Sequence, residues 1–178
     1  MKKTLKIALY VLLALVLIVL AYVIYVFAAY YRVEDMQKLG VAHCDAASAA
    51  PMEGAPQTGV TYRVSSANVG FGAYSADYSF FMDGGKQVRA PSKAIAEKNM
   101  DGIVSTVKDL NADFTFLQEI EADPSTRSYG IEEAERMRTE TGLDTAHARN
   151  YKCAFVPYPI PPIGKVSSGI MTLSTAPI

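Results

Sequence analysis

One apolar run near the N-terminus constrains this chain more than any other feature. Residues Ile7–Ala29 carry no charge and are almost wholly apolar, and three lysines precede them at Lys2, Lys3 and Lys6. A helix of this length, at about 1.5 Å per residue, extends roughly 34 Å and is long enough to cross the core of a bilayer. We therefore predict one transmembrane helix within residues 1–32. A cleaved signal peptide is the alternative, although its apolar region has only about 7–15 residues.

The charges beside the run predict its orientation. The lysines before it favour a cytoplasmic N-terminus at the cell membrane, and the rest of the chain then lies outside the cytoplasm. Residues 33–58 are rich in Ala, Pro, Gly and Ser without a sustained period, which is typical of a flexible linker. The folded domain is expected to occupy residues 59–178.

The net charge of residues 33–178 bears on whether the domain binds nucleic acid. Residues 33–178 contain thirteen Lys and Arg and eighteen Asp and Glu, a net charge of 13 − 18 = −5. Proteins that grip nucleic acid do so mainly by neutralising phosphates with a basic face. The balance therefore argues against nucleic-acid binding of that kind.

The domain reads as an alternation of strands and helices. Apolar and aromatic runs predict strands at 60–68, 114–119 and 169–174, and paired strands at 143–147 and 151–156 with a bend at 148–150. Ser92 is positioned to cap a helix that runs to Leu110, and a second helix is expected from 131 to 141, before Gly142. These elements predict an α+β fold, a layered half-domain with a mixed sheet and helices on one face.

Two of the predicted strands end in polar residues. Asn68 closes the first strand and enters a glycine-rich loop, and Glu119 closes the strand that begins at Phe114. Since one helix joins these strands, they should be parallel neighbours with both residues at the same rim of the sheet. A carboxylate and an amide oxygen suit Mg²⁺, which takes few protein ligands and keeps several waters. An ordinary solvated Glu and a turn-forming Asn are the simpler interpretations.

Three short motifs occur in order within the domain. They are Ala-Asn-Val-Gly at 67–70, Leu-Gln-Glu-Ile at 117–120, and Ser-Gly-Ile-Met-Thr-Leu-Ser at 168–174 before Ala-Pro-Ile at 176–178. In these motifs the chain resembles the endonuclease/exonuclease/phosphatase superfamily of metal-dependent phosphoesterases. Its members open with a strand ending in Asn, continue to Leu-Gln-Glu, and later carry Gly-x-x-x-x-Ser before Pro-Ile.

The resemblance implies a reaction and also an incomplete domain. It implies hydrolysis of a phosphoester assisted by Mg²⁺ or Mn²⁺, with the metal weakly held by Glu119 and assisted by Asn68. The family's later Gly-Asp-x-Asn and Ser-Asp-His motifs, which carry the general base, do not occur in these 178 residues. We therefore expect the N-terminal part of a phosphoesterase, with no catalytic base of its own and no activity alone. Because the two halves of such a domain pack their sheets together, one apolar sheet face should remain uncovered.

Other polar residues are weaker candidates. His147 lies in a mid-domain strand rather than in a Ser-Asp-His turn, so we interpret it as a structural or surface histidine. Arg149, Tyr151 and Lys165 are candidates for contacts with a phosphate at the rim, although solvated strand ends explain them equally well.

The sequence leaves two classes of function open. The first is a membrane-tethered extracytoplasmic phosphoesterase. Its net charge and tether favour lipid headgroups or small phosphoesters over DNA, and no protein partner is predicted. The second is a non-catalytic, degenerate binding module anchored to the membrane. The aromatic residues of the loop at 69–91 fit contact with a membrane or with a substrate base.

Overall fold

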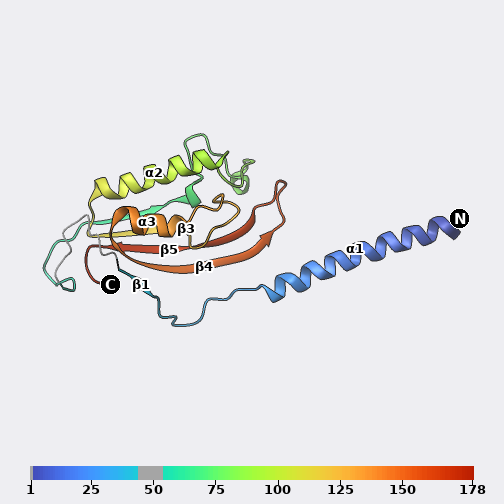
Figure 1. Ribbon diagram of the computed structural model, residues 1–178, viewed down its shortest axis with the longest axis horizontal. Helices are drawn as coiled ribbons and strands as arrows, with labels where there is room; N and C mark the ends of the chain where they lie inside the picture. Colours follow the sequence, from blue (N-terminus) through green and yellow to red (C-terminus); the bar gives the residue numbers. More distant parts are fainter. Residues whose placement is uncertain (1, 44–53) are drawn as a thin grey trace. The chain divides into compact units, whose positions relative to one another are not determined.

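The protein forms two compact units, residues 1–32 and 33–178, in a computed structural model that describes residues 2–43 and 54–178 (Figure 1). The first unit consists of helix α1, Lys2–Ala28, which has no buried residue. By length and composition this helix is able to cross a membrane. The predicted apolar helix is thus confirmed.

The second unit is built on a five-stranded mixed sheet in the order β1-β4-β5-β3-β2. The strands are β1 (Val41–Ala42), β2 (Val64–Asn68), β3 (Phe114–Glu121), β4 (Asp144–Val156) and β5 (Gly164–Ser174). Among these described strands, β2 and β3 run parallel, and the other neighbours are antiparallel. Helix α2, Lys93–Leu110, connects the parallel pair, as the sequence predicted (Figure 1).

Helices cover one face of the sheet. The side-chain oxygen of Ser92 accepts a hydrogen bond from the Ile95 backbone at 3.3 Å, so the predicted cap begins α2. Helix α3, Glu133–Thr141, contacts both α2 and the sheet and ends at Gly142 in a left-handed conformation. Apolar side chains of both helices pack on those of β3 and β5 in one buried core. The helices supply Ala96, Met100, Val104, Val107 and Met137, and the strands supply Leu117, Met171 and Leu173. The predicted α+β fold with helices on one face is confirmed.

The opposite face of the sheet is exposed. Val64, Phe116 and Ile170 are 58%, 41% and 49% exposed, respectively. In register they alternate with buried neighbours such as Leu117 and Met171, which point toward the helices. The described residues thus leave one partly apolar sheet face uncovered, as the resemblance implied.

The structure corrects the prediction of two paired strands at 143–147 and 151–156. Both segments belong to β4, and both pair with β5. The register shifts between Arg149 and Tyr151, so the chain absorbs Asn150 as a bulge and does not reverse there. The chain reverses instead at the proline-rich loop 157–163, where the pyrrolidine rings exclude ladder hydrogen bonds.

A short strand lies within the range predicted as linker. Val41 and Ala42 pair with Ala146 and Thr145 and make β1 the edge of the sheet. Next to it, His43 Nδ1 lies 2.8 Å from the carboxylate of Asp144. Residues 44–53 of the predicted linker lie outside the described residues.

Candidate functional site

The two predicted ligands end neighbouring strands. Asn68 is the register partner of Gln118, and the next residue along β3 is Glu119. The backbone N–H of Val69 also donates to the Gln118 carbonyl at 2.9 Å, which continues the pairing one residue beyond β2. Both residues therefore lie at the same rim, and the predicted parallel pairing of their strands is confirmed.

Glu119 occupies an irregular position in β3. Its φ is +56°, and the register with β5 shifts between Gln118 and Ile120, so Glu119 is the extra residue of a bulge. A non-glycine residue in this region is uncommon and marks a place where a side chain is redirected. The side chain is half-buried. Burial raises the pKa of Tyr74 in the loop at 69–91, and the negative charge of Glu119 raises that pKa further. The carboxylate thus acts on the loop that follows Asn68.

Asn68 has a structural role. Its Oδ1 accepts a hydrogen bond from the Gly70 backbone at 2.9 Å, which forms a turn closed by the side chain. Gly70 has φ +52°, and a Cβ atom there would lie 2.1 Å from the ring of Tyr74. Asn68 is therefore a turn-forming residue, which was the simpler of the two interpretations from sequence. Its amide oxygen retains a second lone pair that is able to accept another contact.

The donors at the rim fit only a loosely held cation. One carboxylate and one amide oxygen are hard ligands that suit Mg²⁺ or Mn²⁺ with most positions left to water. Within residues 2–43 and 54–178, no group of three or more His, Cys, Asp or Glu side chains is arranged to hold a metal. The metal role of Glu119 and Asn68 therefore stays a prediction.

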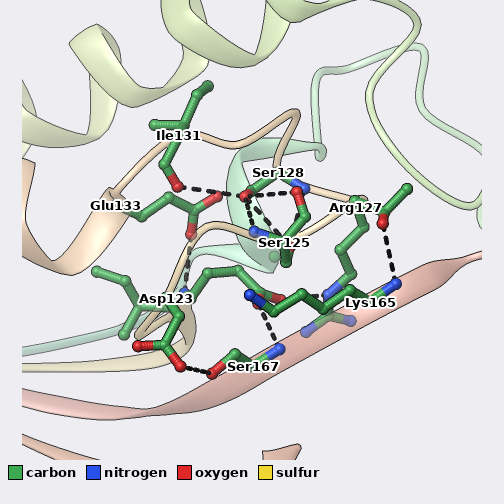
Figure 2. Close-up of polar contacts among 12 residues, drawn as sticks. Asp123, Ser125, Arg127, Ser128, Ile131, Glu133, Lys165 and Ser167 are labelled. Atoms are coloured by element: carbon green, nitrogen blue, oxygen red, sulfur yellow. Dashed lines mark hydrogen bonds and ion pairs between the residues drawn. The ribbon is translucent and has the colours of Figure 1, made fainter. Parts of the chain in front are cut away.

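Behind the rim lies a buried ionic network that the sequence did not indicate (Figure 2). Glu121 is fully buried, forms an ion pair with Arg127, and accepts a 2.7 Å hydrogen bond from the Ser167 backbone. The guanidinium of Arg127 lies 4.0 Å from the centre of the Phe71 ring. Arg127 thus joins the loop after β3 to the loop after β2, a cation–π contact added to the ion pair.

Glu133, at the start of α3, completes this network. Its Oε2 accepts a hydrogen bond from the Glu121 backbone at 3.0 Å, while its Oε1 is buried with no partner among the described residues. Burial raises the pKa of Glu133 to about 8, so the carboxyl is protonated at neutral pH. Glu133 therefore contributes a neutral hydrogen-bonding group to the core rather than a second anion beside Glu121.

We expect Glu133→Gln to flatten the pH dependence of stability. The folded-state pKa of about 8 lies above the ordinary value of 4.5, so between these values the folded state holds one more proton. The free energy of unfolding should fall as pH rises through this range, by up to about 1.4 kcal/mol per pH unit, and glutamine removes that loss. Thermal unfolding of the full chain in detergent between pH 5 and 9 measures it. Glu132→Gln, at an exposed neighbour, is the control, and parallel curves for wild type and Glu133→Gln would contradict the prediction.

A second polar group includes His147. Its Nε2 lies 3.4 Å from the Ile120 carbonyl oxygen, one residue from Glu119, and burial lowers the pKa of the imidazole. A Cβ on Gly169 would lie 2.4 Å from the imidazole, so only glycine leaves room for this ring. The half-buried position agrees with a structural histidine and also places a neutral imidazole near the rim.

Arg149 and Asp123 lie near His147. Arg149 donates to Asp123 at 2.6 Å and to the Ser167 hydroxyl at 2.9 Å, and that hydroxyl donates to Asp123 at 3.0 Å. Among the other candidates for phosphate contact, Tyr151 is exposed on β4, and the Lys165 backbone N–H donates to Thr126. Arg149 is thus held near the rim by partners that the sequence did not reveal.

A cavity of about 400 Å³ lies between β2 and α2. Its wall includes Asn68, Tyr74, Lys98 and Asn99 at polar positions, and Ile103 and Leu117 at apolar ones. Glu119 does not line it. The structure therefore brings the two predicted ligands to one rim but not into one cavity.

Comparison of this chain with models of protein families, with curated proteins and with solved structures finds no match.

Proposed function

We propose that this chain is the N-terminal part of a membrane-tethered, divalent-metal-dependent phosphoesterase. The observation that carries the proposal is the pairing of Asn68 with Gln118, which puts an amide and a carboxylate at the ends of adjacent parallel strands. The bulge at Glu119 supports it, because bulges frequently redirect side chains beside active sites.

The chemistry follows from these two groups. A bound divalent ion would supply Lewis acidity toward a phosphoryl oxygen. Glu119 would hold it by charge, and Asn68 would orient the loop that begins at Val69. The general base is proposed to come from sequence outside these 178 residues, because His147 bonds to a backbone carbonyl and its ring packs on Gly169. The net charge of −5 for residues 33–178 favours lipid headgroups or small phosphoesters over DNA.

A non-catalytic membrane-anchored module is the second candidate. One observation favours it: the charged groups next to the rim bond to one another, Glu121 to Arg127 and Asp123 to Arg149. Charged groups that pair with one another in this way have a structural role and are not free to bind a substrate or a metal.

Metal binding by the full chain tests the proposal. In detergent, Mn²⁺ titration followed by electron paramagnetic resonance should show one weak site that Glu119→Gln abolishes. Glu97→Gln removes an exposed carboxylate of α2 and should leave binding unchanged. Absence of binding, or binding that persists in Glu119→Gln, would contradict the phosphoesterase and favour the second candidate.

We further propose that the N-terminus is cytoplasmic and residues 33–178 are outside. Lys2, Lys3 and Lys6 precede the apolar helix, and the positive-inside rule favours their retention in the cytoplasm. Protease added to intact cells should digest the domain and leave the anchor. Digestion that requires permeabilised cells would show the reverse orientation.

A further inference from the structure

The hairpin of β4 and β5 ends in an exposed apolar loop. Tyr158 and Ile160 in the loop are 69% and 93% exposed, and Phe155 at the end of β4 is 41% exposed. Four prolines in the same loop, at 157, 159, 161 and 162, restrict its backbone. The loop therefore presents large apolar side chains to solvent on a stiff backbone, where the entropic cost of ordering a contact is small.

A second loop extends this surface. The rings of Phe81 and Tyr158 lie 6.1 Å apart at 72°, so the loop before α2 meets the hairpin loop. Met82, next to Phe81, is 73% exposed. We call these five residues the apolar tip: Phe81, Met82, Phe155, Tyr158 and Ile160.

The charge around the tip differs from the charge of the whole unit. Strands β4 and β5 contain the basic residues Arg149, Lys152 and Lys165 and one acidic residue, Asp144, a net charge of +2. Arg149 is paired with Asp123, so Lys152 and Lys165 are the basic residues that flank the hairpin loop, and Asp83 follows Met82. The unit as a whole carries −5. The tip is thus the end of a basic hairpin in an acidic unit, which is the charge that an anionic surface attracts.

We propose that the apolar tip inserts into the interface of an anionic lipid bilayer. Aromatic and aliphatic side chains beside basic residues form the pattern of segments that bind in the plane of a membrane. Tyrosine in particular prefers the boundary between headgroups and hydrocarbon. Residues 29–40, between α1 and β1, are twelve residues that span at most roughly 40 Å, so a bilayer holding α1 is always near. The inference requires the anchor but not the phosphoesterase activity.

A single tryptophan tests the contact, because the chain contains none. Ile160→Trp in the full chain is reconstituted into liposomes of phosphatidylcholine and phosphatidylglycerol, with or without bromine-labelled acyl chains. Leu110→Trp is the matched control at another exposed aliphatic residue. Leu110 ends α2, about 27 Å along the helix from the loop that carries Met82.

The expected result is that Ile160→Trp loses most of its emission to brominated lipid and shifts to shorter wavelength, while Leu110→Trp does neither. Removing phosphatidylglycerol should reduce the loss. Equal quenching of both variants, no quenching of Ile160→Trp, or quenching that ignores lipid charge would overturn the proposal. Circular dichroism confirms folding, and Tyr158→Trp provides a second reporter in the same loop.

Discussion

Replacing Arg127 with methionine should lower the free energy of unfolding by about 3–5 kcal/mol. Glu121 has no exposed surface, and Arg127 is its ionic partner. Removing one partner of a buried pair leaves the other charge uncompensated in the interior, which costs far more than the pair itself contributes. The same change removes the cation–π contact with Phe71. Guanidinium denaturation of the full chain in detergent measures the effect.

Two further variants make this prediction specific. Arg138→Met removes an arginine that pairs with Glu135 on the surface of α3, and it should cost no more than about 1 kcal/mol. Combining Arg127→Met with Glu121→Gln removes both charges, keeps an acceptor for the Ser167 backbone N–H, and should recover much of the loss. A stability of Arg127→Met within about 1 kcal/mol of wild type would mean that the pair does not hold the two loops.

The second large effect concerns activity. In a protein extended by the natural downstream sequence, Glu119→Gln should reduce the turnover of a phosphodiester about 100-fold or more. Metal stabilisation of transition-state charge contributes several kcal/mol, and each 1.4 kcal/mol is tenfold in rate. The fold should persist, because Glu119 lies in a bulge at the rim and not in the core. Hydrolysis of bis(p-nitrophenyl) phosphate with Mg²⁺ or Mn²⁺ measures it.

The control for this experiment is Glu97→Gln, which should retain full activity. The 178-residue chain by itself should be inactive, because among the residues that the structure describes the histidine near the rim, His147, bonds to the Ile120 backbone carbonyl and is not oriented by a carboxylate. Robust metal-dependent cleavage by this chain alone, or an active Glu119→Gln, would show that the machinery has been assigned to the wrong residues. His147, next to Ile120, would then be the first residue to substitute.

The elements that follow from local chemistry were predictable from the sequence. The cap at Ser92, the end of α3 at Gly142 and the parallel pairing of β2 with β3 depend on residue types and on one connecting helix. The single strand β4 was not predictable, because a bulge at Asn150 and a bend have the same polar sequence pattern. Its long-range pairing with β5 decides between them.

The ionic network was hidden for a different reason. Arg127 lies in a loop and Glu133 begins a charged helix, so both read as solvated residues in sequence. Their burial depends on the packing of the segment between the end of β3 and the start of α3 against the loop at Phe71, which is about fifty residues earlier in the chain. A local sequence pattern does not predict which distant segments pack together. It also does not predict which carboxylate lies within ion-pair distance of which arginine.

Strand β1 sets how far the domain moves from its anchor. Among the described residues, two register pairs join β1 to β4, and His43 beside them bonds to Asp144, so local opening there requires far less free energy than unfolding of the sheet. While β1 is paired, residues 29–40 connect it to α1; if α1 crosses a membrane, they keep the domain within roughly 40 Å of the point where α1 leaves the bilayer. If β1 detaches, residues 41 and 42 lose their pairing with β4, and the stretch of chain between α1 and the sheet becomes longer. A force applied through α1 would therefore detach β1 before it disrupts the other strands of the sheet.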